Sequence, residues 1–318
     1  MSIKSIKIEK KIKKFEQAMI PEKETFVLPK IKSILLALDA HDWIIESSRH
    51  SIKVTGELSI INDAYVTIIC MAVTEEEHTM SEKLVNEAVA YLEKRKVKSH
   101  GLCIVGPPSG NILKLLTEEN ADLLVLPSPF AERVENDNEF SLGATVEILL
   151  NKSEVPLLLL NEPGDSLKNI TEKIVLSVQG KDDVLPIEWA LALSNELTNI
   201  YILNTVKTES IEVFKDVSQD LLDENINERL IEISLRKYTT SLLNVLKAFA
   251  NENALKVTVS ERVGGLVEMI TEELIHGKTS LLIVDSRIAL ENGSVLVKVA
   301  KKYSVPLLIT RKRAARAL

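Results

Sequence analysis

Short apolar runs alternate with amphipathic stretches along the whole chain, a pattern typical of strands and helices that follow one another in turn. In the first half, apolar or β-branched runs predict strands near residues 32–38, 65–72, 100–105, 122–127 and 155–160. The stretches between them predict helices near 43–60, 81–96, 110–119 and 143–151. Because the runs are apolar without alternation, we expect parallel strands buried between two layers of helices.

The second half shows the same order of elements. Its strands are predicted near 173–178, 199–205, 255–260, 280–285 and 305–310. Its helices are predicted near 184–197, 237–253, 265–276 and 293–302. Alternating strands and helices favour an α/β fold, here two tandem doubly wound domains, because connections between parallel strands are right-handed crossovers.

The two halves end on the same sequence pattern. Residues 142–160 read LGATVEILLNKSEVPLLLL, and residues 292–310 read NGSVLVKVAKKYSVPLLIT. Gly143 and Gly293 lie 150 residues apart, and so do Pro156 and Pro306. A shared spacing through a glycine, a helix, a proline and a strand indicates an internal duplication.

The duplication divides the chain into segments. We expect a basic N-terminal arm or helix at 1–29, a first domain at 30–162 and a linker rich in turn-forming residues at 163–169. A second domain is expected at 170–311, with an insertion at about 208–236 that has no counterpart in the first. The spacing of apolar residues in this insertion predicts one or two amphipathic helices. A basic tail at 312–318 follows.

Composition and charge narrow the classes of partner. The formal net charge of −7 argues against nucleic acid as a ligand, although both ends of the chain are basic and could contact an acidic membrane surface. No apolar run is long enough to cross a bilayer, and the start lacks a signal-peptide pattern, so a cytoplasmic location is expected. Cys70 and Cys103 lie in predicted strands and are expected to be free thiols.

Several short motifs recur in a fixed order. In the first half they are Asp39 after strand 1, Gly106–Pro108 before a helix, ADLLVLPS at Ala121–Ser128, Gly143–Thr145 at a helix start, and Val155–Leu160. In the second half they are Glu188–Leu191, Gly264–Gly265, Asp285–Arg287, Gly293–Ser294 and Val305–Ile309. This order, found twice, resembles the universal stress protein family over about residues 30–310, as a tandem pair.

The resemblance implies a five-stranded parallel sheet of order 3-2-1-4-5 in each domain. Ligands of such sheets bind at the carboxyl ends of the strands, between strands 1 and 4. Domains of this family often pair through their last strand, which implies an intramolecular pseudo-dimer here and leaves a homodimer possible. Some members bind ATP through a glycine-rich loop after strand 4. The positions that match the family's binding residues are Asp39, Gly106, Gly143, Ala144, Thr145, Arg287, Gly293 and Ser294.

The glycine-rich loop itself is degenerate in both halves. In the first half, Pro127 and Phe130 stand where the family has glycines, and proline has no amide hydrogen to offer a phosphate. The following loop is longer than the motif and acidic, which repels a triphosphate. In the second half, Asp285 replaces the first glycine and Gln179 replaces the strand-1 aspartate. We therefore expect no tightly bound cofactor, with ATP as the one candidate.

No pattern predicts catalysis or a metal site. The five histidines are scattered without metal-ligand spacing, and we expect His41, which follows strand 1, to be a surface residue. Residues 105–111 (VGPPSGN) lack the Gly-Lys-Ser/Thr of a phosphate loop and predict a strand-to-helix turn, with Ser109 as the helix N-cap.

The sequence leaves three hypotheses about function. The first is a non-enzymatic stress-response or regulatory protein with degenerate nucleotide sites and an unidentified protein partner. The second is a sensor for ATP or another nucleotide, with weak ATPase activity. The third is a soluble regulator of a membrane transporter, held at the membrane by its basic ends.

Overall fold

A computed structural model describes residues 26–41, 44–72, 74–128, 130, 143–161, 166–178, 183–206, 228–290 and 295–311. Most of the predicted N-terminal arm, the tail at 312–318, and the site candidates Gly293 and Ser294 lie outside these residues. Much of the predicted insertion does as well.

The first half alternates strands and helices as predicted. Its elements are β1 (Ser33–Leu38), α2 (Ile45–Asn62), β2 (Tyr65–Ala72), α3 (Glu75–Glu93), β3 (Ser99–Val105), α4 (Pro108–Glu118), β4 (Leu123–Pro127), α5 (Ala144–Lys152) and β5 (Leu157–Leu160). A short helix, α6 (Leu167–Ile170), leads into the second half.

The second half repeats the alternation. Its elements are β6 (Lys173–Val178), α7 (Val184–Leu193), β7 (Asn199–Val206), α9 (Glu228–Glu252), β8 (Lys256–Val263), α10 (Leu266–His276), β9 (Leu281–Asp285), α11 (Ser286–Leu290), α12 (Val295–Lys302) and β10 (Leu307–Thr310). None of the helices that the structure describes has the length and apolar character of a membrane span.

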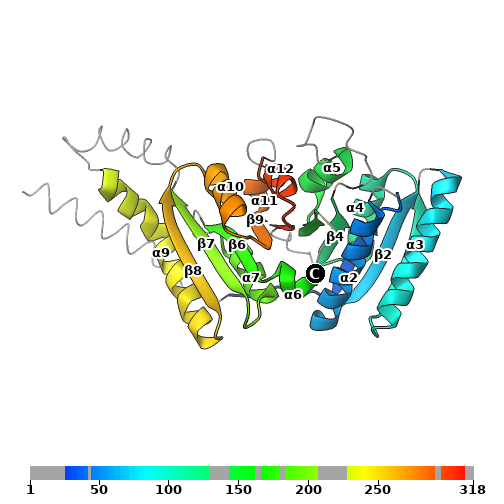
Figure 1. Ribbon diagram of the computed structural model, residues 1–318, viewed down its shortest axis with the longest axis horizontal. Coiled ribbons are helices and arrows are strands. Elements are labelled where there is room, and N and C mark those ends of the chain that lie inside the picture. Colours follow the sequence, from blue (N-terminus) through cyan, green and yellow to red (C-terminus); the bar gives the residue numbers. More distant parts are fainter. Residues whose placement is uncertain are drawn as a thin grey trace, which may run out of the picture.

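All strands of the described residues join one ten-stranded sheet of order β3-β2-β1-β4-β5-β10-β9-β6-β7-β8. Each half contributes five parallel strands in the order 3-2-1-4-5, which confirms the predicted fold class. The last strands of the two halves pair antiparallel, with Leu158 opposite Leu308. The halves therefore form the expected pseudo-dimer within one chain (Figure 1).

Helices cover both faces of the sheet, and the apolar residues of each strand alternate between two cores. In β1, Ile34, Leu36 and Leu38 face the layer that contains α2, α3, α6, α7 and α9. Leu35 and Ala37 face the layer that contains α4, α5, α10, α11 and α12. Each core runs through both halves, so the seam between β5 and β10 is buried on both sides.

Polar contacts also tie the halves together. The backbone N–H of Leu167 in α6 donates to Oε2 of Glu57 in α2 at 2.6 Å. The chain before β1 reaches the second half, where Val27 N–H donates to Oε1 of Glu188 at 2.7 Å. Next to it, the ring of Phe26 packs edge-on against Phe249 of α9, with 5.9 Å between ring centroids.

Two helix starts differ from the prediction. Ser109 as an N-cap is wrong, because α4 begins at Pro108 and Pro107 is its N-cap. A proline suits the first helical position, since its fixed φ matches the helix and its missing N–H has no partner there. Helix α3 begins earlier than predicted, because Thr74 and Glu77 form a capping box in which each side chain accepts the other's backbone N–H.

Two short helices were not predicted. Helix α6 begins inside the predicted linker. Helix α11 follows β9 directly, where the sequence indicated only a short loop. Helix α9 begins at Glu228, inside the predicted insertion. The amphipathic pattern expected earlier in that insertion lies outside the described residues.

Candidate functional site

Within each half the parallel strands end at one edge, which gathers the predicted site residues of that half there. Because the halves pair antiparallel, the two sets lie at opposite edges of the ten-stranded sheet. Asp39 follows β1, and Gly106 follows β3. Gly143 is the N-cap of α5, with a φ of 82° that glycine adopts most readily, and Ala144 and Thr145 form the first turn. In the second half, Arg287 lies in α11, beside the end of β9.

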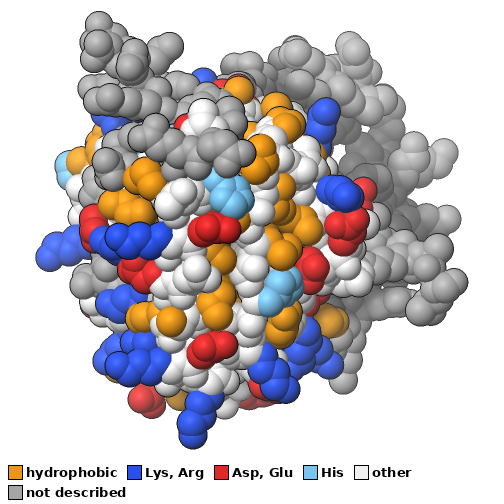
Figure 2. Space-filling model, turned by 90° about the vertical axis from the view of Figure 1, so that its right-hand side faces the viewer, with side chains coloured by type: hydrophobic (Ala, Val, Ile, Leu, Met, Phe, Trp, Pro, Cys, Tyr) orange, Lys and Arg blue, Asp and Glu red, His pale blue; other side chains and the backbone are white. Residues whose placement is uncertain are grey.

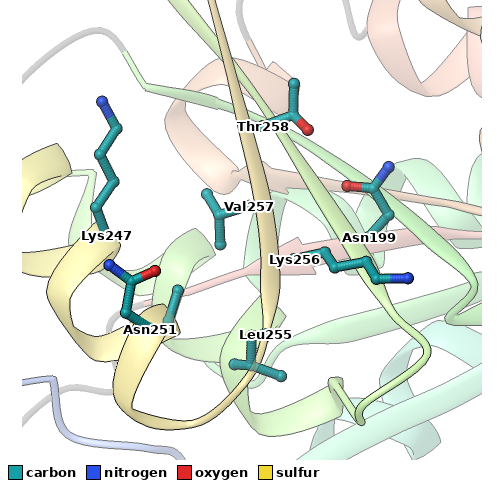
Figure 3. A pocket seen from close by; sticks show the side chains of 8 residues that line it. Asn199, Lys247, Asn251, Leu255, Lys256, Val257 and Thr258 are labelled. Carbon is teal, nitrogen blue, oxygen red and sulfur yellow. The ribbon is translucent and has the colours of Figure 1, made fainter.

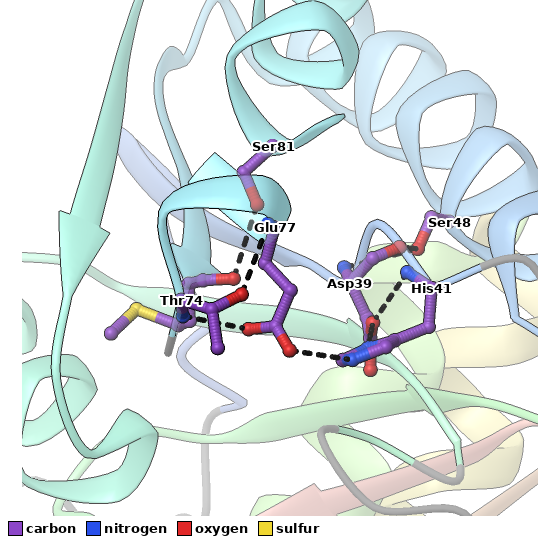
Figure 4. A network of polar contacts seen from close by, with 7 residues as sticks. Asp39, His41, Ser48, Thr74, Glu77 and Ser81 are labelled. Atoms are coloured by element: carbon purple, nitrogen blue, oxygen red, sulfur yellow. Dashed lines mark hydrogen bonds and ion pairs between the residues drawn. The ribbon is translucent and has the colours of Figure 1, made fainter. Parts of the chain in front are cut away.

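At the switch point of the first half, the carboxylate of Asp39 is held by its own loop (Figure 4). Asp39 is buried, and its Oδ1 lies 2.5 Å from Nδ1 of His41 and accepts the His41 N–H at 3.0 Å. The other ring nitrogen of His41 lies 3.7 Å from Oε1 of Glu77 in α3. His41 is partly exposed, as expected, but the sequence did not indicate that it bridges two carboxylates.

The backbone of Asp39 is fixed as well. Its N–H donates to Oγ of Ser48 in α2 at 3.1 Å, and this hydroxyl donates to the Asp39 carbonyl oxygen at 2.6 Å. Both contacts are buried, so the end of β1 is anchored to the helix that follows it. The residue that would orient a ligand at this position is therefore already engaged by protein groups.

The end of β4 offers few amides to an anion. Pro127 has no N–H, and the N–H of Ser128 donates to the Leu160 carbonyl oxygen of β5 at 3.0 Å. The ring of Phe130 is fully buried in the core on this face. Ser128 Oγ is also buried, and within the described residues it has no hydrogen-bond partner. The sequence drew attention to Pro127 and Phe130 but not to Ser128.

At the switch point of the second half, two buried aspartates share one arginine. Oδ1 of Asp285 accepts the backbone N–H of Arg287 at 2.9 Å and its Nε–H at 2.7 Å. Nη2 of Arg287 also donates to Oδ1 of Asp183, the N-cap residue of α7, at 3.1 Å. Asp285 is only 4% exposed, and the Arg287 guanidinium is a close partner of its carboxylate. The bridge links the loops that follow β6 and β9.

A second arginine lies close to this bridge. Arg311 directly follows β10, and burial lowers its pKa while the nearby charge of Asp285 partly raises it. Its Nε and Nη2 are buried and have no hydrogen-bond partner in the part of the chain that the structure describes. Sequence analysis missed Asp183 and Arg311, because neither belongs to a motif and both lie far from Asp285 in sequence.

A hollow of about 580 Å³ lies at the amino ends of two strands of the second half, where β7 and β8 begin (Figure 3). Its lining residues are Asn199, Lys247, Ala250, Asn251, Leu255, Lys256, Val257 and Thr258. Lys247 and Lys256 extend away from each other on the two sides of β8 (Figure 3). The two charged groups of the hollow therefore do not converge on one point.

The described residues indicate neither metal binding nor a reactive thiol. Among the described residues, no group of three or more His, Cys, Asp or Glu side chains could hold a metal ion. Cys70 and Cys103 are free and lie opposite each other on β2 and β3. Burial raises the pKa of Cys70 to about 12, so its thiol stays protonated at neutral pH and is a poor nucleophile.

The fold defines a tandem pair of doubly wound α/β units, joined through their last strands. A universal stress protein from Archaeoglobus fulgidus DSM 4304 matches it with a TM-score of 0.62 at 14% identity, covering 89% of this chain and 98% of that chain. A functionally unknown protein from Pseudomonas aeruginosa PAO1 matches with a TM-score of 0.57 at 11% identity, covering 89% and 93%. The chain thus has the fold of a tandem universal stress protein. No protein-family model and no curated protein matches it.

Proposed function

We propose that the chain is a non-enzymatic regulatory protein of the universal stress type, which acts through a protein partner and has lost tight nucleotide binding. The observation that carries this proposal is the bridge of Asp285, Arg287 and Asp183. In a phosphate site, backbone N–H groups at a helix start face the anion. Here Asp285 stands where the family's loop has its first glycine, and its carboxylate accepts the N–H of Arg287, so this amide is not offered to an anion.

Electrostatics then oppose a nucleotide at this point. A triphosphate would approach two buried carboxylates, and it would compete for the arginine that neutralises them. Drawing this arginine away would leave the buried carboxylates without compensation, which opposes phosphate binding.

The first half supports the same conclusion by a different route. Pro127 has no amide hydrogen and the amide of Ser128 is bonded to β5, so the start of the loop cannot cradle a phosphate. The loop sequence that follows, residues 131–142, contains four acidic residues. A different local change thus disfavours phosphate in each half.

The proposal of a non-enzymatic role rests on the surroundings of His41. Asp39 and His41 form the arrangement most similar to part of a catalytic triad, because a carboxylate orients one ring nitrogen. The other ring nitrogen lies 3.7 Å from the carboxylate of Glu77. In a catalytic triad this nitrogen would face the nucleophile, so the contact with Glu77 supports a structural role for His41.

A second candidate function, nucleotide or anion sensing in the second half, is favoured by Arg311. Its Nε and Nη2 are buried donors without a partner among the described residues, and such donors suit a phosphate oxygen. An anion that binds there would contact Arg311 beside Asp285. The two candidate functions predict different effects of ATP on the stability of the purified protein.

Native mass spectrometry and thermal unfolding separate the two. For the first proposal we expect no copurified nucleotide mass, no ATP hydrolysis above background and no rise of the melting temperature with about 1 mM magnesium ATP. A rise of several degrees that disappears in an Arg311→Gln variant would instead establish the second candidate. Lys152→Gln, an exposed substitution at the end of α5, serves as the control for charge loss.

Contact with a membrane surface and a cytoplasmic location stay predictions, because the basic ends of the chain lie outside the described residues. A protein held by basic segments leaves membranes when salt screens its charges. We expect the purified chain to bind vesicles with anionic lipids less at about 0.5 M salt than at about 0.05 M if those ends act in this way.

A further inference from the structure

Two neighbouring helices of the first half end beside each other, at the amino ends of the strands that follow them. Helices α2 and α3 are in contact, because a Cβ added at Gly56 of α2 would lie 3.0 Å from Cδ2 of Leu92 and 3.6 Å from Cε1 of Tyr91 in α3. Both helices end shortly beyond this contact, α2 at Asn62 and α3 at Glu93. The chain then enters β2 and β3, so both helix ends lie where these strands begin (Figure 1).

Two isoleucines in the last turn of α2 are exposed at this place. Ile60 is 54% exposed, and Ile61 is 71% exposed. Residues four apart lie on one face of a helix, so Ile60 lies one turn beyond Gly56, on the side of α3. In the same way, Ile61 lies one turn beyond Glu57, whose Oε2 accepts from the Leu167 N–H of α6. The two isoleucines therefore lie between the end of α3 and α6.

Basic side chains lie on both sides of the isoleucines. Lys94, Arg95 and Lys96 directly follow α3, and all three are exposed. The Arg95 guanidinium lies 3.6 Å from the centre of the Tyr91 ring, on the part of α3 that contacts α2. On the other side, Lys168 of α6 is exposed. Figure 2 shows Lys and Arg side chains gathered in the lower part of the molecule, where α3 ends in Figure 1.

Acidic side chains are fewer at these helix ends. Among the described residues that follow the three helices, Asp63, Glu93 and Glu172 are exposed. Lys32 adds a positive charge beside them, because its Nζ donates to the Asn62 carbonyl oxygen at 3.1 Å. An apolar centre with predominantly basic surroundings results, which we call the basal patch and define by the exposed residues Ile60, Ile61, Lys94, Arg95, Lys96 and Lys168.

We propose that the basal patch docks on the surface of a membrane that contains anionic lipids, with Ile60 and Ile61 inserted between the headgroups. Apolar side chains at the boundary of headgroups and acyl chains are removed from water, which favours binding. The basic side chains around them attract the lipid phosphates. The negative net charge of the chain opposes this attraction only weakly, because salt screens charges farther than about 10 Å from the membrane.

The composition of the patch favours a lipid surface over a protein or a nucleic acid. Protein interfaces are depleted of lysine and rely on aromatic anchors, whereas the basal patch has three lysines around an aliphatic centre. Nucleic-acid sites combine basic residues with side chains that hydrogen-bond to bases or stack on them, and isoleucine does neither. Basic residues beside exposed aliphatic ones match the two layers of an anionic membrane surface.

Docking through the basal patch leaves the switch point of the first half accessible. Strands β1, β2 and β3 are parallel, so Asp39 and Gly106 follow the ends that point away from the patch. The inference therefore depends neither on the nucleotide sites nor on the basic ends of the chain, which lie outside the described residues. Val105, which is 62% exposed, lies at the far end of β3 and offers a control position.

Flotation of the full chain with lipid vesicles tests the docking. We expect binding to vesicles of phosphatidylcholine mixed with phosphatidylglycerol at about 0.05 M salt, and weaker binding at about 0.5 M salt or without phosphatidylglycerol. Ile60→Ser combined with Ile61→Ser should lower the partition coefficient at least about tenfold. Lys94→Gln combined with Arg95→Gln and Lys96→Gln should lower it to a similar extent.

Two variants serve as matched controls and should bind as the parent protein does. Val105→Ser shortens an exposed apolar side chain away from the patch. Lys312→Gln combined with Arg313→Gln and Arg316→Gln removes three charges from the tail. The proposal is overturned if the parent does not bind anionic vesicles at low salt, if the tail variant loses as much binding as the patch variant, or if the isoleucine variant binds as the parent does.

Fluorescence tests the insertion separately, even if one of the combined variants fails to fold. A Cys103→Ser background leaves only the buried Cys70, so a nitrobenzoxadiazole label attaches at the introduced thiol of Ile61→Cys or Val105→Cys. With anionic vesicles, the emission of the label at position 61 should rise and shift to the blue, because its surroundings lose water. The label at position 105 should not respond. Equal responses, or none at position 61, contradict the proposed orientation.

Discussion

At the scale of single residues, an arginine neutralises two buried carboxylates at the carboxyl ends of the strands of the second half. Asp285 and Asp183 are both buried, and Arg287 donates to each of them. The arginine side chain itself is 58% exposed, so water screens part of the interaction. The bridge is therefore expected to make a moderate contribution to stability.

Arg287→Gln should lower the free energy of unfolding by about 1–2 kcal/mol, below the 3–5 kcal/mol typical of a fully buried pair, because the arginine is partly exposed. Urea unfolding at neutral pH measures the change. Arg95→Gln is the control, since Arg95 lies on the surface over the Tyr91 ring at 3.6 Å and should cost less than about 1 kcal/mol. Equal effects of the two substitutions would contradict the role of the bridge.

Glu188 gives the molecule a pH-dependent contact. Burial raises its pKa above the ordinary value of 4.5, and the hydrogen bond from Val27 N–H partly lowers it. A carboxyl with a raised folded-state pKa binds more protons in the native state, so its ionisation destabilises the fold as the pH rises from 4.5 through the folded-state pKa.

Glu188→Gln keeps the oxygen that accepts from Val27 N–H and removes the ionisation. The variant should be more stable than the parent above the folded-state pKa of Glu188, and this advantage should disappear as the pH falls to about 4.5. Thermal unfolding of both proteins between about pH 4 and pH 8 measures the difference. A difference that does not change with pH would contradict the assignment.

The sequence predicted part of this residue-level picture. It drew attention to Asp39, Asp285 and Arg287, because a motif marks each position. It did not predict that Asp183 and Arg311 approach Asp285, since these contacts join segments that only folding brings together. It also did not predict the 2.5 Å contact of His41 with Asp39, which depends on the turn after β1.

At the scale of elements, α3 lies close against β3 because one position of that strand has no side chain. A Cβ added at Gly101 would lie 2.2 Å from Cγ1 of Val85 in α3. Val85 is buried and cannot move aside without disturbing the core. Gly110 in α4 is the opposite case, because no atom lies within 4 Å of a Cβ built there.

Alanine at these two glycines should change stability in opposite directions. Gly101→Ala should lower the free energy of unfolding by about 1–3 kcal/mol through overpacking. Gly110→Ala should raise it by about 0.5–1 kcal/mol, because alanine favours the helix. Chemical denaturation measures both. If both substitutions changed the free energy of unfolding in the same direction, the close packing of α3 on Gly101 would not explain the effect.

The strands were easier to predict than the helix ends. A strand buried on both faces reads as an apolar run, and the predicted strands of the first half agree with those of the structure within two residues at each end. Helix ends depend on capping contacts that hydrophobic periodicity does not record, such as the box of Thr74 and Glu77. Helix α11 was missed because five residues are too few to show a period.

At the scale of the whole molecule, the antiparallel seam of β5 and β10 turns two units into one sheet with two shared cores. The sheet order and the pairing through the last strands came from the resemblance to a known family, because strand order within a parallel sheet cannot be derived from periodicity. The structure confirms both. The predicted domain boundaries stay predictions.

A shared core should make the two halves unfold together. The sequence provides one tryptophan for each half, Trp43 and Trp189, so Trp43→Phe and Trp189→Phe each leave one fluorescent reporter. Corrected for the stability change that each substitution causes, both reporters should give one urea transition with the same midpoint. Two separate transitions would show that the seam does not couple the halves.

The proposed loss of tight nucleotide binding rests on the protein contacts at the ends of β4 and β9. Isothermal titration of the full chain with magnesium ATP tests this claim most directly. We predict no saturable heat up to about 1 mM nucleotide, because Asp285 and the end of β4 leave no cradle for phosphate. A saturable isotherm with a Kd below about 100 μM would contradict the claim.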